Sequence, residues 1–232
     1  MPTAVLTGCN SGIGYEWAKI LLKEGYKLYA LDATDGEKLQ SLKGSKCTTA
    51  QVDVTSVESI EKFKQSIGDE PVDLLLNIAG IMIDPEHDSR ETTNLQIIEK
   101  QFKVNTYGPV LLTQALTPNL LAAPAPRRLG VVSSRVGSIA DNTSGGYYGY
   151  RASKTAVNSF FKSFAVDLKE HEVIVFMLHP GFTKTNLSEM IWKIPGVVEP
   201  EVAAEGLWKI VKGKGMEDTG KFWHREGMEL PW

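Results

Sequence analysis

The sequence has 232 residues, of which 42% are hydrophobic and 23% charged, and its formal net charge is -3. This length and balance predict a single globular domain over residues 1–232, and the scattered basic residues argue against a nucleic-acid partner. The sequence contains no apolar stretch of about 18 residues and no basic segment leading into an apolar run, so we expect a cytoplasmic protein with no membrane association.

Short apolar runs alternate with helical patterns along the whole chain. The runs predict seven β-strands, at residues 3–7, 27–31, 47–52, 72–76, 129–133, 173–178 and 221–223. Helical patterns fill most intervals between them. This alternation predicts an α/β fold, a Rossmann-type doubly wound parallel sheet of about seven strands flanked by helices. In such a sheet the functional residues gather at the carboxyl ends of the strands.

Local signals define three further segments. Residues 55–58, with the sequence Thr-Ser-Val-Glu, have the form of a capping box that begins a helix. One long helix is expected to begin at Thr92 and to be closed by Pro118 and the Pro/Ala-rich residues 122–126. Residues 184–198 follow the sixth predicted strand and are expected to form a mobile substrate flap.

Three glycines follow the first predicted strand, at positions 8, 12 and 14. They permit a tight turn and a close backbone approach, and the helix that follows presents free N–H groups to a pyrophosphate. A glycine-rich turn without a ligand is the alternative. The position between a strand and a helix favours a dinucleotide site.

Asp32 closes the second predicted strand, eighteen residues beyond Gly14. A carboxylate at this position accepts hydrogen bonds from both hydroxyls of an adenosine ribose and repels a 2'-phosphate. Asn10 and Ser11 add no positive charge inside the glycine loop, so the sequence favours NAD over NADP. Asp32 can instead cap the next turn, and Asp53 has two similar interpretations, a contact with adenine or a helix cap.

Tyr150 and Lys154 are four residues apart in a predicted helix, which places their side chains on the same face. An ammonium beside a phenol favours the phenolate and lowers the phenol pKa from its usual value of about 10, so this pair predicts an acid–base group. The alternative is an exposed helix pair. Tyr15 and Lys19 repeat the spacing with no serine-bearing strand before them and are interpreted as such a surface pair.

Cysteine and histidine usage predicts neither a disulfide scaffold nor a metal site. The chain has only Cys9 and Cys47, and its four histidines lack the spacing of metal ligands.

Six motifs resemble, in order, those of the classical short-chain dehydrogenases/reductases. They are Thr7-Gly8-x-x-x-Gly12-Ile13-Gly14, Asn77-Ile78-Ala79-Gly80, Lys103-Val104-Asn105, Ser133-Ser134-x-x-Gly137, Tyr150-x-x-x-Lys154 and Pro180-Gly181. Two stretches, Ser-Ser-Arg-Val-Gly-Ser and Gly-Tyr-Arg-Ala-Ser-Lys, look most like the C-factor and sniffer-like carbonyl reductases. Two features depart from the family pattern: Ile78 stands where a second Asn is usual, and the interval from Ser134 to Tyr150 is a few residues longer than in many members.

The resemblance implies a catalytic group of four residues. Tyr150 would exchange a proton with the substrate oxygen, while Lys154 would lower the pKa of Tyr150 and hold the nicotinamide ribose. Ser134 would hydrogen-bond the substrate oxygen. Asn105 would hold a water near Lys154, or its buried amide would only satisfy backbone groups. The expected cofactor-binding residues are Gly8, Asn10, Ser11, Gly12, Ile13, Gly14, Asp32, Asp53, Val54, Asn77, Ala79, Gly80, Tyr150, Lys154, Pro180, Gly181, Thr183 and Thr185.

The implied function is an oxidoreductase that transfers a hydride between NAD and a small to medium, partly apolar alcohol or ketone. Its substrate pocket is expected to involve Tyr147, Met190, Trp192 and Ile194. An NADPH-dependent carbonyl reductase and a dinucleotide-binding signalling protein without essential turnover are the alternatives. The resemblance also implies a homodimer or homotetramer, paired through residues 92–120 and 148–170.

Overall fold

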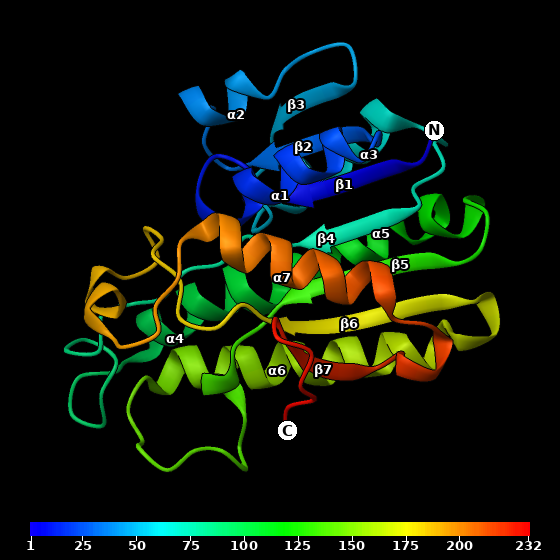
Figure 1. Cartoon of the computed structure of the whole chain (residues 1–232). Helices are drawn as coiled ribbons and strands as arrows, with labels where there is room; N and C mark the ends of the chain where they lie inside the picture. Colours follow the sequence, from blue (N-terminus) through cyan, green and yellow to red (C-terminus); the bar gives the residue numbers. More distant parts are fainter.

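The computed structural model describes residues 1–232, apart from the side chain of Ile191. Its seven strands are β1 Thr3–Thr7, β2 Lys27–Asp32, β3 Cys47–Gln51, β4 Leu74–Asn77, β5 Arg127–Val132, β6 Val173–His179 and β7 Lys221–His224. They form one parallel sheet in the order β3-β2-β1-β4-β5-β6-β7 (Figure 1). The predicted doubly wound parallel sheet is confirmed, and its winding reverses between the neighbouring strands β1 and β4.

Helices cover both faces of the sheet. The α-helices of the described chain are α1 Gly12–Lys23, α2 Glu37–Ser41, α3 Val57–Ile67, α4 Leu95–Phe102, α5 Gly108–Ala122, α6 Tyr148–Asp167 and α7 Pro200–Gly213. Helices α1, α2 and α7 share one hydrophobic cluster with the sheet, whereas α3, α5 and α6 share the other. Figure 1 shows α1 and α7 together in front of the strands.

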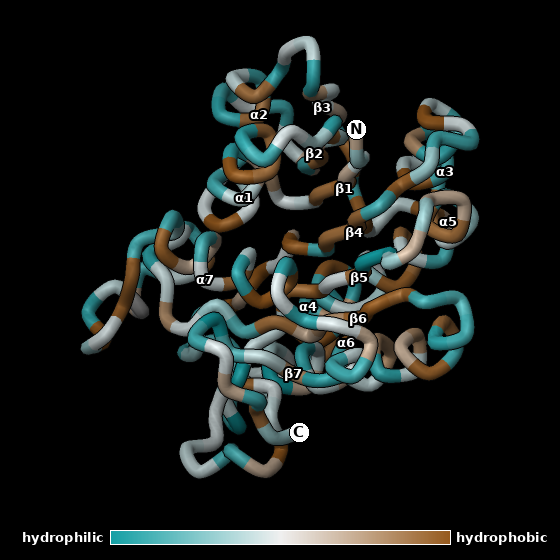
Figure 2. Tube along the Cα trace, turned by 45° about the vertical axis from the view of Figure 1, so that its right-hand side comes forward, coloured by the Kyte–Doolittle hydropathy of each residue, from teal (hydrophilic) through white to brown (hydrophobic). Residues whose placement is uncertain are grey.

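Strand β6 shows how one sequence serves both clusters. Ile174, Phe176 and Leu178 enter the cluster with α1 and α7, and the alternate residues Val175 and Met177 enter the opposite one. A continuous apolar run is required because both faces are covered. Figure 2 shows hydrophobic residues concentrated along strands such as β6 and hydrophilic residues in many of the connecting loops.

The single long helix expected from Thr92 is interrupted, which corrects the sequence prediction. Helix α4 begins after Asn94, whose side chain accepts a hydrogen bond from the Ile97 N–H at 3.1 Å. A π-helical segment, Lys103–Tyr107, then separates α4 from α5. Such a segment inserts an extra residue into the helical turn and re-aims the side chains on it.

Pro118 lies inside α5 and does not close it, a second correction. Proline removes one backbone hydrogen bond and costs a helix about 3 kcal/mol. The flanking Leu116 and Leu120 are fully buried on the sheet, and each contributes roughly 1.5–3 kcal/mol. The burial of these two leucines therefore offsets the cost of Pro118, and α5 continues past it to Ala122.

Helix α3 begins one residue later than the expected capping box. Its N-cap is Ser56, whose hydroxyl accepts from the Ser59 N–H at 3.2 Å. Thr55 instead donates its hydroxyl to the Asp53 carboxylate at 2.7 Å. The Thr55-to-Glu58 pairing was therefore wrong, because Asp53 competes for Thr55.

Within the described residues, no helix is both long and apolar enough to cross a membrane. The same residues contain no group of three or more His, Cys, Asp or Glu side chains placed to bind a metal ion.

Candidate active site

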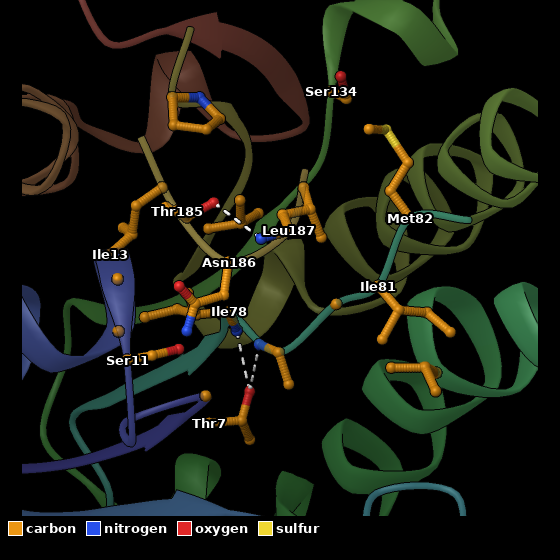
Figure 3. Close-up of a pocket in the computed structure, with 18 of the residues that line it drawn as sticks. Thr7, Ser11, Ile13, Ile78, Ile81, Met82, Ser134, Thr185, Asn186 and Leu187 are labelled. Carbon is orange, nitrogen blue, oxygen red and sulfur yellow. Dashed lines mark hydrogen bonds between the residues drawn. The ribbon is translucent and has the colours of Figure 1, made fainter. Parts of the chain in front are cut away.

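A cavity of about 480 Å³ lies at the carboxyl ends of the central strands. Its walls come from the β1–α1 loop, the ends of β4, β5 and β6, and the first half of α6. Figure 3 shows Ser11 and Ile13 on one side of this cavity, and Ile81, Met82 and Ser134 on the other. Segments far apart in the sequence therefore meet at one rim, as the parallel sheet requires.

The glycine loop fits the close approach of a phosphate. Gly8 and Gly12 have positive φ angles of 73° and 51°, which side chains rarely adopt. A Cβ on Gly14 would lie 2.1 Å from the Gly8 carbonyl oxygen, so only glycine is accommodated there. Among the described contacts of α1, the N-cap Ser11 makes no side-chain hydrogen bond to the first turn and that turn has no acidic residue. Its N–H groups are thus available to a pyrophosphate.

Thr7, at the end of β1, connects this strand to the segment that follows β4. The winding of the sheet reverses between β1 and β4. The Thr7 hydroxyl accepts hydrogen bonds from the backbone N–H groups of Ile78 and Ala79 at 2.9 and 3.0 Å (Figure 3). The segment after β4 is thereby fixed against the end of β1. Gly80 follows, and a Cβ on it would lie 3.2 Å from Asn105 Oδ1 and 3.4 Å from Lys154 Nζ. Gly80 therefore lets this segment pack closely against Asn105 and Lys154.

Asp32 lies on the cavity wall at the end of β2. Its carboxylate oxygens accept from the Asn10 and Thr34 N–H groups, each at 2.9 Å. A carboxylate has room for further donors, so these bonds orient Asp32 without exhausting it. Asp53 also lies on the wall, and its carboxylate caps the turn through Thr55 N–H at 2.8 Å.

Tyr150 and Lys154 are buried on the same face of α6 and both line the cavity. Lys154 Nζ lies 5.9 Å from the centre of the Tyr150 ring and donates to the Val132 carbonyl at 2.9 Å. Ser134 follows β5 on the same wall and is also buried. The Ser134 hydroxyl accepts from the Val136 N–H at 3.2 Å, which fixes the side chain at the start of the loop.

Burial dominates the electrostatics of this pair. It raises the pKa of Tyr150 to about 12, although the Ser134 hydroxyl acts in the opposite direction. Burial also lowers the pKa of Lys154 to about 8. The desolvation of Tyr150 thus outweighs the lowering of its pKa that the sequence led us to expect from Lys154.

Asn105 lies in the π-helical segment, and its side chain is fully buried. The amide oxygen accepts from the Ile81 N–H at 2.8 Å, and the amide nitrogen donates to the Ile81 carbonyl at 2.9 Å. The nitrogen also donates to the Ser153 hydroxyl at 3.1 Å, and Ser153 donates to the Tyr150 carbonyl at 2.8 Å. Asn105 therefore satisfies the backbone, the second of its two interpretations. Its role in holding a water stays a prediction.

Residues 2–194 match the model of the family described as short chain dehydrogenase. The chain belongs to the short-chain dehydrogenase family. It is therefore a nicotinamide-dependent oxidoreductase, as predicted, and the small-molecule substrate expected from the sequence follows from the same assignment.

Relatives of this short-chain dehydrogenase cover most or all of its length. It is 35% identical over 234 residues to the 1-hydroxy-2-glutathionyl-2-methyl-3-butene dehydrogenase of Rhodococcus sp. (strain AD45), covering 100% of both chains. It is 32% identical to the C-signal protein of Myxococcus xanthus, over 73% of this chain and 98% of that protein. The solved structure of an NADPH-bound carbonyl reductase from chicken fatty liver superposes with a TM-score of 0.88 at 26% identity, covering 100% of this chain and 99% of that one. These likenesses agree with the predicted C-factor and carbonyl reductase subgroup.

Most of the site residues expected from the sequence of this short-chain dehydrogenase line the cavity. They are Gly8, Ser11, Gly12, Ile13, Gly14, Asp32, Asp53, Val54, Ala79, Gly80, Ser134, Tyr150, Lys154, Pro180, Gly181, Thr183 and Thr185. Three expected residues lie behind the described lining. Asn10 accepts from the Leu39 N–H at 3.0 Å, Asn77 donates to the Thr113 hydroxyl at 3.2 Å, and Asn105 contacts Ile81. Of these three amides, the Asn105 side chain bonds a residue of the wall, Ile81.

Other lining residues were missed. The apolar ones include Ile81, Met82, Val104, Val132, Val136, Phe182 and Leu187, and the polar ones include Thr7, Ser133, His179 and Asn186. Thr7 carried a usable signal, because it ends a strand as Asp32 does. The expected pocket residues Tyr147, Met190, Trp192 and Ile194 do not belong to the described lining, and Met190 and Trp192 are exposed.

Proposed function

We propose that this protein is an NAD-dependent dehydrogenase or carbonyl reductase of small to medium, partly apolar alcohols and ketones. The observation that carries the proposal is that Tyr150, Lys154 and Ser134 face the same cavity as the glycine loop. The cradle fits a dinucleotide, because Gly14 lets the start of α1 pack directly against the Gly8 carbonyl, which brings the backbone N–H groups of the loop to the cavity. The apolar lining beyond Ser134 fits a substrate that is partly apolar.

A bound nicotinamide supplies or accepts the hydride. Tyr150 holds the proton that a carbonyl oxygen takes up during reduction, and it receives that proton during oxidation. The Ser134 hydroxyl donates to the same substrate oxygen, where negative charge develops. Lys154 places a positive charge beside the phenol and is oriented by the Val132 carbonyl. The carbonyl of Tyr150 is held by Ser153, which keeps this part of α6 in place.

The pH dependence of the reaction is expected to differ between the two directions. At neutral pH the phenol of Tyr150 is protonated, because burial raises its pKa to about 12, so reduction has its proton in place. Oxidation requires Tyr150 as a phenolate, so Tyr150 and Lys154 together must have lost one proton. The two groups titrate as a coupled pair, and the first proton leaves that pair near the pKa of Lys154, which burial lowers to about 8. Initial rates of alcohol oxidation should rise roughly tenfold per pH unit below that value and level off above it. An oxidation rate that is flat between about pH 6 and 8 would contradict this assignment.

The preference for NAD rests on the charge around Asp32. Lys154, at the catalytic end, is the only cationic side chain among the described lining residues. A 2'-phosphate beside Asp32 would therefore meet a carboxylate with no compensating charge. The carbonyl reductase from chicken fatty liver is bound to NADPH, which makes this preference the point at which the two proteins are expected to differ.

Asp32→Ser is expected to lower kcat/KM for NADH by roughly 10–100-fold, since a hydrogen bond to a charged group contributes about 1.5–3 kcal/mol. The efficiency with NADPH should stay equal or rise. Asp35→Ser is the matched control, because it removes a neighbouring exposed carboxylate that does not line the cavity. A wild-type efficiency higher with NADPH than with NADH would overturn the NAD assignment.

The function itself is tested by following NADH absorbance with a panel of acetophenone, cyclohexanone, diacetyl, benzyl alcohol and S-hydroxyethylglutathione. The last compound is included because the Rhodococcus relative is named for a glutathionyl alcohol. Turnover of at least one member supports the proposal. Tight NADH binding with no turnover of any member would favour the alternative, a dinucleotide-binding signalling protein without essential turnover.

Three further parts of the proposal concern the whole chain. Residues 184–198 serve as a substrate flap of a single domain. The pairing of Thr183 with Val198 at its base and the exposed Met190 and Trp192 on it support this role.

The protein forms a dimer or tetramer. The exposed Phe160 and Val166 on α6 support this assembly, and sedimentation velocity tests it. The cytoplasmic location expected from the sequence stays a prediction that cell fractionation tests.

A further inference from the structure

Asp88 is a fully buried carboxylate in the loop between β4 and α4. Four donors surround it at 2.8–3.0 Å: the backbone N–H groups of Gly149 and Tyr150, the Gln101 amide and the Thr93 hydroxyl. Each carboxylate oxygen accepts two of these bonds. A buried carboxylate is costly unless it is paired or hydrogen-bonded in this way, so its presence calls for an explanation.

Two of the donors belong to the first turn of α6. The N-cap residue of that helix, Tyr147, has a left-handed φ of 52° and makes no side-chain cap bond among the described contacts. Asp88, sixty-one residues before Gly149 in the sequence, caps the helix in its place. Its own carbonyl also accepts from the Tyr148 N–H at 3.2 Å. The start of α6 is therefore fixed by a segment outside the helix.

Gly149 allows the start of α6 to lie close to Asp88, because it has no side chain. A Cβ at this position would lie 2.5 Å from Gln101 Nε2 and 3.4 Å from Asp88 Oδ1. The absence of a side chain lets the helix start press directly against the carboxylate and its Gln101 partner. Gln101 is in turn positioned by the Ile83 N–H, which donates to its amide oxygen at 3.2 Å.

The carboxylate is ionised at neutral pH. Burial acts to raise the pKa of Asp88, but the hydrogen bonds from Gln101, Gly149 and Tyr150 outweigh it and the pKa is lowered. A negative charge at the N-terminus of α6 also interacts favourably with the helix dipole. Asp88 is thus a fixed charge, bonded to the backbone of the residue that carries the acid–base phenol.

We propose that Asp88 is a positioning residue that holds the Tyr150 backbone, and with it the phenol, in line with the substrate oxygen. The proposal rests on the proposed function, in which Tyr150 exchanges the proton. Both backbone polar groups of Tyr150 are held: Asp88 accepts from its N–H and Ser153 donates to its carbonyl. Small displacements of a reacting group reduce rates strongly, so this anchor affects the chemical step more than cofactor binding.

Asp88→Asn tests the proposal, because an amide nitrogen must then face one of the two pairs of donors. Its NH₂ group opposes a backbone N–H of α6 in either orientation. We expect kcat to fall about 10–100-fold, with NADH affinity within about twofold of wild type. The kinetic isotope effect with deuterated NADH should increase, because the chemical step becomes slower relative to the other steps. The assay uses whichever compound of the panel above the wild type turns over fastest.

Thr93→Val is the matched control, since it removes one hydrogen bond from the same carboxylate and leaves both α6 bonds intact. It should lower thermal stability but leave kcat and the isotope effect unchanged. If Asp88→Asn does not fold, Gly149→Ala replaces it: the added methyl displaces the helix start and should lower kcat while NADH affinity is retained.

The outcomes separate this proposal from the one on which it rests. If Tyr150→Phe stays active, the proposed function fails. If Tyr150→Phe is inactive but Asp88→Asn, or Gly149→Ala in its place, keeps the wild-type kcat and isotope effect, only the positioning role of Asp88 is overturned. A loss of stability with unchanged kcat likewise assigns Asp88 a purely structural role and overturns the proposal.

Discussion

Tyr150→Phe is expected to abolish turnover while the protein stays folded and binds NADH. The substitution removes a single buried oxygen and keeps the ring that packs on α6. Loss of a general acid–base group lowers rates by about 10²–10⁴-fold, and no other hydroxyl is held beside Lys154 among the described lining residues on that face of α6. The measurement is single-turnover hydride transfer, with NADH binding followed separately by fluorescence.

Lys154→Met is expected to give a similar loss, because it removes the only Lys or Arg side chain among the described lining residues and breaks the bond to the Val132 carbonyl. Tyr15→Phe is the matched control. Tyr15 and Lys19 repeat the same spacing on α1, but Lys19 pairs with Glu16 at 2.6 Å and Tyr15 contacts Ser41 outside the cavity. Full activity of Tyr150→Phe, or inactivity of Tyr15→Phe, would remove the acid–base assignment.

Gly14→Ala is expected to weaken NADH binding by more than about 100-fold, equivalent to about 2.7 kcal/mol. The added methyl would lie 2.1 Å from the Gly8 carbonyl, which belongs to the backbone and cannot rotate away as a side chain would. The loop and the start of α1 must therefore separate, and the N–H groups that would hold a pyrophosphate move with them. Isothermal titration with NADH measures the effect.

Gly213→Ala provides the comparison for Gly14→Ala. Gly213 ends α7, and a Cβ there meets nothing within 4 Å. The two variants carry the same chemical change, so a difference in NADH affinity reports the crowding at Gly14. Equal affinities of both variants and the wild type would show that the glycine loop does not form the phosphate cradle.

The sequence predicted those parts of the site that depend on strand ends. Asp32, Ser134 and Pro180 each follow a buried apolar run, and parallel pairing brings such ends to one edge whatever the details of the helices. Helical spacing similarly placed Tyr150 and Lys154 on one face. These features follow from periodicity, which is a local property.

The features that were missed depend on contacts between distant segments. Asp88 lies in a polar stretch without periodicity, and only the folded chain places it beneath α6. The pKa of Tyr150 depends on how deeply α6 packs, which spacing alone does not determine. The π-helical segment around Asn105 and the helix that continues through Pro118 both arise because tertiary packing overrides local preference.

The link from Thr7 to the segment after β4 depends on the side chain at position 7 but only on the backbone at positions 78 and 79. The Thr7 hydroxyl binds two backbone N–H groups, so the connection does not depend on which side chain occupies position 78. Ile78 can therefore stand at this position without loss of the link, although the resemblance noted in the sequence led us to expect Asn there. For protein engineering, position 78 is therefore a site where the cavity wall can be redesigned without loosening the centre of the sheet, whereas Thr7 is not.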